Sequence, residues 1–320
     1  MLTERLSVNN PADLIRAVEL LKSGALVAVP TETVYGLAAD ASNPDAVKEI
    51  FRAKGRPADH PLITHIASPE AIQHWAINVP DWVTDLCAEF WPGPLTLILE
   101  KHDRVPEVIT GGHPTIGLRM PNQPALLQLL QQEQLAIAAP SANPYQRLSP
   151  TSADQVLAGL EGKIAAVLDA GPCQVGTEST ILSVVGGRAK LLRAGSITAT
   201  QLQPYVPLSI DVPKQHLEAV SGNKEIHYRP GTPVYLKSMA EIREADLGEL
   251  RIGQINHSGA MSRTADICRN LGSDAKGYRH HLYATLYEFD QLQLDAIWVE
   301  RVPDNEEWAD IADRLQKAAN

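Results

Sequence analysis

Short apolar segments alternate with amphipathic segments along the first 196 residues of this 320-residue chain. Apolar side chains recur at helical spacing in four segments, at about 45–54, 81–90, 123–132 and 152–159. Runs typical of buried strands separate them: ALVAVP, LITHI, LTLILE, TIGLRM, LAIAA, IAAVLDA, STILSV and AKLLRA. This alternation predicts an α/β domain built on one large, twisted, mixed sheet with flanking helices.

A second α/β pattern follows a proline-rich segment. The prolines interrupt any regular element, because proline lacks an amide hydrogen and fixes φ; they are Pro204, Pro207, Pro213 and Pro230. Beyond them, strand-like VYL, LRIGQI and AIWVE and the helical stretch YRHHLYATLYEFDQL predict a small, Rossmann-like α/β domain. The 320 residues also exceed the length at which one hydrophobic core usually stops growing, so two domains are expected. The predicted organisation is a large domain, a linker and a small domain, at residues 10–196, 197–232 and 233–320.

Composition excludes several classes of protein. The formal net charge of −10 argues against a large nucleic-acid surface, because neutralising phosphates requires a basic face. The three cysteines, Cys87, Cys173 and Cys268, lie too far apart in sequence for a zinc or redox motif. No apolar run approaches the roughly 20 residues that span a bilayer. We therefore expect a cytoplasmic protein without a disulfide framework, a structural metal site or a membrane span.

Polar side chains cluster beside the predicted strands of the large domain. PTETVYGLAADA places Thr31, Glu32 and Thr33 after a buried strand, where side chains of α/β sheets face a cleft. For Tyr35 in the same segment, two interpretations are equally open: a functional residue at this cleft, and a buried residue that only packs. RAKGRPADHPLITHI carries cations that suit a polyphosphate or a solvated loop, and three later segments add further polar groups. These residues are Lys54, Arg56, His65, Thr115, Arg119, Ser141, Asn143, Ser149, Ser179 and Arg193.

Motifs for covalent and P-loop chemistry are missing from the sequence. There is no GxxxxGK[ST] loop, so a bound nucleotide must be held in another way. There is no GxSxG elbow either, nor a cysteine near a histidine. Electrostatic positioning of substrates is therefore the expected strategy.

Six motifs in a fixed order resemble a known family: PTETVYGL, KGRPADHPL, FWPGPLTLIL, TIGLRMP, APSAN and ESTI. They are similar to the YrdC-type domain of the L-threonylcarbamoyladenylate (threonylcarbamoyl-AMP) synthases. The runs LYATLYEFD and DAIWVE resemble the extra C-terminal domain of the long, two-domain form. The resemblance implies a nucleotidyltransferase that makes threonylcarbamoyl-AMP and pyrophosphate from L-threonine, bicarbonate and ATP, with Mg²⁺ accompanying ATP.

The resemblance also implies roles for residues of this sequence. Lys54 and Arg56 would act as catalytic electrostatic clamps. The contacts to threonine would come from Thr33, His65, Arg119, Ala139 and Ser179. The contacts to ATP would come from Arg56, His60, Thr115, Ser141, Asn143, Ser149, Arg193 and Tyr228. His60 stands where the family usually has asparagine, so its contact with ATP is an open question.

The family's linker carries a His-Tyr pair that folds over the active site, and HYRPGTPV matches it here with His227 and Tyr228. A lid would exclude water from a labile adenylate. The alternative is that Tyr228 only packs the small domain onto the large one. If Tyr228 is a lid, its loss should weaken ATP binding with little change in melting temperature.

The resemblance implies that the product passes to the tRNA threonylcarbamoyl-transfer machinery, with little direct tRNA binding by this chain. An alternative function is an RNA-binding module of the same fold without adenylation activity. The related carbamoyl-transferring hydrogenase maturation enzyme is less similar, since this chain lacks its cysteine-rich zinc elements.

Overall fold

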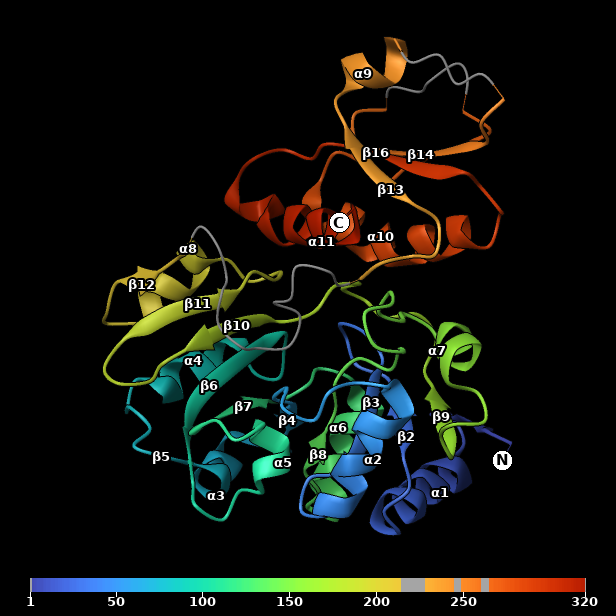
Figure 1. Cartoon of the computed structure of the whole chain (residues 1–320). Coiled ribbons are helices and arrows are strands. Elements are labelled where there is room, and N and C mark those ends of the chain that lie inside the picture. The colour runs from blue at the N-terminus through green and yellow to red at the C-terminus, as the bar shows by residue number, and fades with distance from the viewer. Residues whose placement is uncertain (1, 214–227, 245–248, 260–264, 320) are drawn as a thin grey trace.

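The computed structural model describes residues 2–213, 228–244, 249–259 and 265–319. Two sheets organise these residues (Figure 1). The larger sheet is mixed and comprises β1 (Glu4–Ser7), β2 (Val27–Val29), β3 (Gly36–Asp40), β4 (Ile63–His65), β5 (Ala76–Ile77), β6 (Leu95–Lys101), β7 (Thr115–Arg119), β8 (Ile137–Ala138), β9 (Ala166–Asp169), β10 (Thr180–Ser183), β11 (Ala189–Arg193) and β12 (Ile210–Asp211).

The strands of the large sheet follow the order β1-β9-β2-β3-β8-β4-β7-β6-β10-β11-β12, with β5 paired to β6. Helices flank this sheet: α1 (Pro11–Lys22), α2 (Pro44–Lys54), α3 (Ile72–Trp75), α4 (Val83–Phe90), α5 (Glu107–Thr110), α6 (Pro124–Glu133), α7 (Ala153–Leu160) and α8 (Ala199–Leu202). α1 and α2 are both capped at their first turns, because Asn10 and Asn43 accept hydrogen bonds from backbone amides there and a proline follows each.

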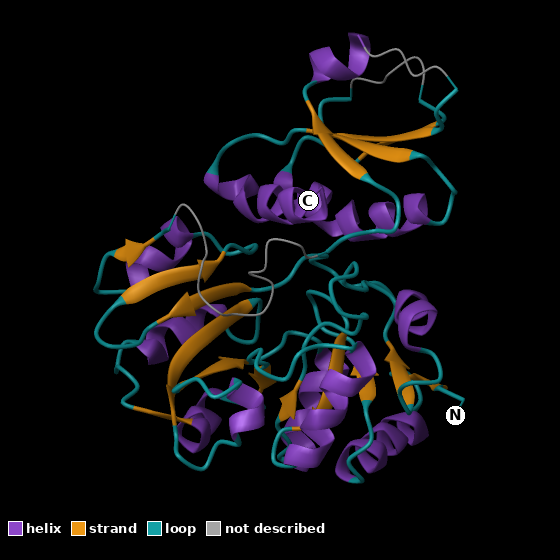
Figure 2. Ribbon diagram, viewed as in Figure 1, coloured by secondary structure: helices purple, strands orange, loops and turns teal. Residues whose placement is uncertain are grey.

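The smaller sheet is entirely parallel, with the order β13-β16-β14-β15. Its strands are β13 (Val234–Lys237), β14 (Ile252–Asn256), β15 (Ile267–Asn270) and β16 (Ala296–Glu300). Its helices are α9 (Met239–Glu244), α10 (Ala275–Asp290) and α11 (Ala309–Ala319). Figure 2 shows α10 and α11 between this sheet and the large domain. The predicted fold class, a large mixed sheet plus a small Rossmann-like domain, is confirmed.

The predicted absence of regular structure at 197–232 is wrong where the structure describes that segment. α8 and a 3₁₀ turn at Gln203–Tyr205 lie there, and β12 pairs in parallel with β11 at the edge of the large sheet. The prolines do not prevent these elements, because Pro204 occupies the first turn of a short helix and Pro207 and Pro213 lie outside β12. His227 lies outside the described residues. None of the helices in the described ranges is long and apolar enough to cross a membrane.

Candidate active site

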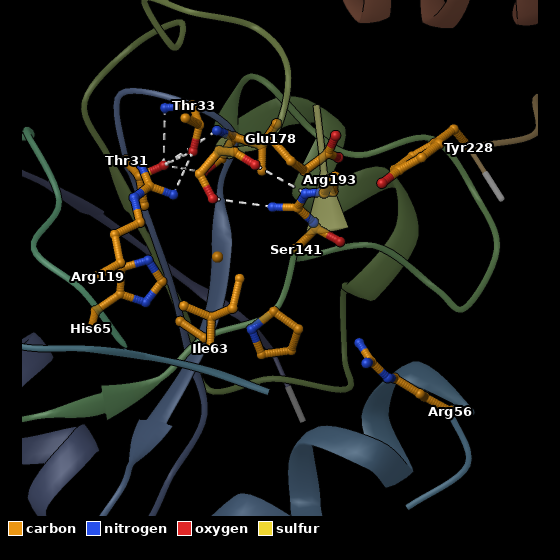
Figure 3. Close-up of a pocket in the computed structure, with 15 residues that line it drawn as sticks. Thr31, Thr33, Arg56, Ile63, His65, Arg119, Ser141, Glu178, Arg193 and Tyr228 are labelled. Carbon is orange, nitrogen blue, oxygen red and sulfur yellow. Dashed lines mark hydrogen bonds between the residues drawn. The ribbon is translucent and has the colours of Figure 1, made fainter. Parts of the chain in front are cut away.

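A cavity of about 50 Å³ opens where several strands of the large sheet end (Figure 3). All five predicted threonine contacts line it, namely Thr33, His65, Arg119, Ala139 and Ser179. Four predicted nucleotide contacts line it as well, namely Arg56, Ser141, Arg193 and Tyr228. Of the remaining lining residues, Thr31 fits the cleft predicted after the buried strand, whereas no role was predicted for Val34, Gly36, Ile63, Pro140 and Glu178.

Strand register brings two buried side chains of the cavity, His65 and Arg119, together. β4 and β7 are parallel, and His65 pairs with Arg119 at their carboxyl ends. Side chains of paired residues point to the same face of a sheet, so both reach the cavity. Arg119 is 4% exposed and forms an ion pair of 2.6 Å with Glu32. It also donates to Thr33 Oγ1 at 3.0 Å and to the Gly93 carbonyl at 3.3 Å.

Hydrogen bonds use two of the five N–H groups of Arg119, one on Nε and one on a terminal nitrogen, while the other terminal nitrogen meets Glu32 as an ion pair, so each terminal nitrogen keeps an N–H group for a ligand. A carboxylate takes one hydrogen from each terminal nitrogen in bidentate pairing. Arg119 can therefore hold its protein partners and a substrate carboxylate together.

His65 faces the cavity as a neutral imidazole. Burial, and next the charge of Arg119, hold the pKa of His65 well below its ordinary value. Both ring nitrogens are buried, and neither has a hydrogen-bond partner among the residues that the structure describes. A neutral imidazole offers one donor and one acceptor. Because unpartnered buried polar groups are costly, this arrangement favours a ligand that supplies both partners.

The turn between β2 and β3 fixes the two threonines at the cavity wall. Thr31 Oγ1 donates to the Val34 carbonyl at 2.6 Å and accepts from the Thr33 amide at 3.1 Å. Tyr35, two residues after Thr33, does not line the cavity, and its hydroxyl donates to the Gly171 carbonyl at 2.8 Å. The packing interpretation of Tyr35 is therefore correct.

Ser179 and Arg193 meet through an antiparallel strand pair, because Ser179 directly precedes β10 and Arg193 ends β11. Arg193 Nε donates to the Ser179 carbonyl at 3.0 Å, and a terminal nitrogen donates to Ser179 Oγ at 3.1 Å. Ser179 Oγ also lies 2.7 Å from Thr96 Oγ1. The Arg193 guanidinium is thus held in one orientation at the cavity wall.

Arg56 reaches the cavity from the loop after α2. One of its terminal nitrogens donates to the Pro61 carbonyl at 3.1 Å. Burial lowers the pKa of Arg56 to about 10, which leaves the guanidinium charged at neutral pH. Lys54, two residues earlier, does not line the cavity. Its ammonium group donates to the backbone carbonyls of Ser141 and Asn143, so it fixes the loop that carries Ser141.

Other predicted nucleotide contacts lie around the cavity rather than in its wall. Asn143 Nδ2 donates to the Pro144 and Arg147 carbonyls, and Ser149 Oγ donates to Glu178 at 2.6 Å. The His60 ring lies 5.7 Å from the Tyr145 ring. Thr115 lies four residues from Arg119 on the same face of β7, about 13 Å away at the usual rise per residue. An extended ligand is required to join Thr115 to the cavity.

Tyr228 belongs both to the cavity and to the core of the small domain. It is 1% exposed, lines the cavity, and stacks on Tyr283 of α10 with ring centroids 5.7 Å apart. Its φ of 59° is unusual for a large residue. The adjoining backbone is fixed because the Arg229 amide donates to the Gln146 carbonyl at 3.0 Å. The packing alternative for Tyr228 is therefore present in the structure, so its loss should lower the melting temperature.

Glu178 is the functional candidate that the sequence analysis missed, although it stands directly before Ser179 in the motif ESTI. Its carboxylate lines the cavity, is 7% exposed, and accepts from Ser149, from Tyr283 and from Arg314 of α11. Burial alone would raise the pKa of Glu178, but Arg314 and next Arg193 outweigh it and hold the pKa at about 2. The carboxylate is therefore charged at neutral pH.

This depressed pKa predicts an acid-sensitive part of the stability. The carboxyl titrates near 4.5 when unfolded and at about 2 when folded, so its stabilisation is complete above pH 4.5 and is lost as the pH falls toward 2. In this window we expect the wild type to lose up to about 3 kcal/mol more unfolding free energy than Glu178→Gln. Urea unfolding at a series of pH values gives the unfolding free energy of the wild type and of Glu178→Gln as a function of pH. Equal slopes for the two proteins would contradict the depressed pKa of Glu178.

Comparisons with known proteins agree with this geometry. A family model described as "Telomere recombination" matches residues 19–195, and one described as "Threonylcarbamoyl-AMP synthase, C-terminal domain" matches residues 197–320. The chain belongs to the threonylcarbamoyl-AMP synthase family. The family resemblance predicted from the six motifs is confirmed.

Members of the threonylcarbamoyl-AMP synthase family match nearly the whole chain. The threonylcarbamoyl-AMP synthase of Bacillus subtilis is 39% identical, covering 99% of this chain and 95% of that protein. The one from Pyrococcus abyssi is 37% identical, covering 95% of this chain and 93% of that protein. The crystal structure of P. abyssi Sua5 complexed with L-threonine matches with a TM-score of 0.92 and 35% identity, covering 100% of this chain and 98% of that one.

Proposed function

We propose that the protein is an L-threonylcarbamoyladenylate synthase, a nucleotidyltransferase that joins L-threonine, bicarbonate and ATP. The observation that carries this proposal is the single cavity in which the predicted threonine contacts and four predicted nucleotide contacts converge. Two findings support it further: the relatives bear this name, and one of them was solved with L-threonine.

The cavity has two sides in Figure 3. The threonine side consists of Thr31, Thr33, His65 and Arg119, and the nucleotide side consists of Arg56 and Tyr228, with Ser141 and Arg193 between them. On the threonine side, Arg119 would pair with the amino-acid carboxylate, and His65 would meet polar groups of the substrate. On the nucleotide side, Arg56 and Arg193 would hold the phosphates.

In the proposed reaction, the threonine amine attacks bicarbonate, and loss of water gives a carbamate. A carbamate oxygen then attacks the α-phosphorus of ATP, the bond to the bridging oxygen breaks, and pyrophosphate leaves. The products are threonylcarbamoyl-AMP, pyrophosphate and water. No side-chain nucleophile is needed, so Arg56 and Arg193 would act by stabilising charge on the transferring phosphoryl group. Lys54 would act indirectly, because it holds the backbone of Ser141.

We propose that Mg²⁺ enters as the complex with ATP. Within the described ranges, no group of three or more His, Cys, Asp or Glu side chains is placed to hold a metal ion. Glu178, which lines the cavity, and Glu32, which contacts the lining residue Arg119, are already paired with arginines. Mg²⁺ commonly binds substrate phosphates with few protein ligands, and it would supply charge neutralisation on them.

The proposal places the product upstream of the tRNA threonylcarbamoyl-transfer machinery in the cytoplasm. The net charge of −10 and the names of the relatives favour the synthase over an RNA-binding module of the same fold. Little direct tRNA binding is therefore part of the proposal.

Incubation with ATP, L-threonine and labelled bicarbonate, followed by chromatography, tests the proposed function. A labelled adenylate that requires all three substrates is the expected product, together with one pyrophosphate per adenylate. Protein that binds tRNA on filters but yields no labelled adenylate would favour the RNA-binding alternative instead.

Serine should replace threonine poorly in this assay. The side-chain methyl of threonine would lie in a small pocket whose apolar wall includes Ile63 and Ala139. One methyl group in such a pocket is worth about 1–3 kcal/mol, so kcat/KM for serine should be about 10- to 200-fold lower. Initial rates at varied concentrations of each amino acid give the ratio. Equal kcat/KM values for serine and threonine would place the side-chain methyl of threonine outside the cavity.

A further inference from the structure

The small domain places a charged residue directly behind the wall of the active-site cavity. Arg314 lies on α11, which Figure 1 shows against the large domain, and its side chain is fully buried. Its Nε donates to Glu178 at 3.0 Å, and one terminal nitrogen donates to the Ala194 carbonyl, next to Arg193, at 3.1 Å. The other terminal nitrogen donates to Asp313 at 2.7 Å. Arg314 therefore bridges the two domains behind the cavity.

Arg314 also supports the aromatic part of the wall. Its guanidinium lies over the ring of Tyr228, 5.4 Å from the centroid, in a cation–π arrangement. Tyr283 stacks on Tyr228 and donates its hydroxyl to Glu178 at 3.1 Å. Glu178 and Tyr228 both line the cavity, whereas Arg314 and Tyr283 stand behind them. Two residues of the small domain thus determine the position of two residues in the site.

The charge of Glu178 explains why such support is needed. A buried carboxylate in the wall of a cavity that takes a triphosphate repels that ligand strongly, because the local dielectric constant is low. It also attracts Arg193, which lines the same cavity and interacts with it electrostatically. A second guanidinium on the far side of Glu178 compensates both effects.

We propose that Arg314 is a positioning residue for nucleotide binding: it neutralises Glu178 from behind, so that the cavity attracts an anionic nucleotide through Arg193 and Arg56. This inference rests on the proposed function for the identity of the nucleotide. It gives the small domain a direct part in the site, because the catalytic domain alone lacks the compensating cation.

Arg314→Met tests the proposal, because methionine keeps much of the side-chain volume and removes the charge. We expect the Kd for ATP, measured by calorimetry with the full chain, and the KM for ATP to rise about 30-fold, while kcat changes less. Adding Glu178→Gln to Arg314→Met should restore ATP binding to within about threefold, because the double variant has no uncompensated carboxylate. Arg314→Lys, which keeps the charge, should bind ATP better than Arg314→Met.

Arg279→Met is a matched control. Arg279 is also a buried arginine of the small domain, and it pairs with Asp310, which accepts from Thr177 of the large domain at 2.9 Å. Arg279→Met should lower the melting temperature and leave the Kd for ATP nearly unchanged. If Arg314→Met binds ATP like the wild type, or if Glu178→Gln fails to restore binding to a folded double variant, the proposal is overturned. Wild-type protein that binds ATP without forming an adenylate would refute the proposed function and leave this test intact.

Discussion

Replacing Arg119 with alanine is expected to abolish most threonine-dependent turnover and to destabilise the protein. Arg119 would hold the threonine carboxylate, and truncation of one partner of a buried charge pair costs about 2–5 kcal/mol. We therefore expect kcat/KM for threonine to fall about 100- to 1,000-fold. Loss of Arg119 also leaves Glu32, which is 4% exposed, as a buried charge without its partner. That change should cost about 3–5 kcal/mol of stability.

A double variant separates the two effects of Arg119. Arg119→Met with Glu32→Gln removes both charges, and the glutamine oxygen can still accept from the Asn122 amide. This variant should regain most of the melting temperature but none of the threonine turnover. Arg16→Ala, which breaks an exposed pair with Glu4, is the control for loss of an ordinary arginine. Recovery of threonine turnover in the double variant would show that Arg119 acts only through folding.

Much of the large domain could be predicted from its sequence because its signals are local. Asn10 with Pro11 and Asn43 with Pro44 mark helix starts, and the observed helices begin there. The largely apolar run LTLILE predicts a buried strand, and β6 forms there. The strands that were not predicted are short, with two to five residues each: β1, β3, β5, β12 and β15. Such segments have no periodicity of their own and form by pairing with a longer neighbour.

The site was predictable only in part, for a related reason. Polar residues beside strand ends, such as Thr33 and Arg119, could be recognised from position and motif. Glu178 shares its motif with Ser179, yet its importance depends on Arg314, 136 positions later in the chain. Arg314 lies on a charged final helix whose sequence is typical of a solvent-exposed surface, and only domain packing shows that it is buried. Long-range pairing of charges leaves no local pattern.

The structure also changes the interpretation of Lys54. The family resemblance implies that Lys54 and Arg56 act together as electrostatic clamps, whereas the basic loop by itself suits either a polyphosphate or solvent. In the structure, the Lys54 ammonium group is bound by carbonyls of the loop at 141–143, whereas Arg56 lines the cavity. Burial, and next the charge of Arg56, lower the pKa of Lys54. Arg56 is therefore the residue of this loop that is best placed to meet a phosphate directly.

Arg56→Ala should consequently reduce adenylate formation by about 100- to 1,000-fold, the usual cost of removing one group that stabilises a developing charge. One terminal nitrogen of Arg56 donates to the Pro61 carbonyl, so the melting temperature of Arg56→Ala is measured beside its rate to separate loss of chemistry from loss of stability. Single-turnover formation of labelled adenylate at saturating ATP measures the chemical step.

Arg52→Ala is the matched control for Arg56→Ala. Arg52 lies on the last turn of α2, four positions before Arg56, and its partner is the exposed Glu49 on the same helix. Exposed pairs of this kind contribute less than about 1 kcal/mol, so Arg52→Ala should keep wild-type turnover and melting temperature. Near-normal turnover in Arg56→Ala would exclude Arg56 as a phosphate clamp. Equal losses in both variants would instead indicate a general effect of positive charge near α2, because only Arg56 lines the cavity.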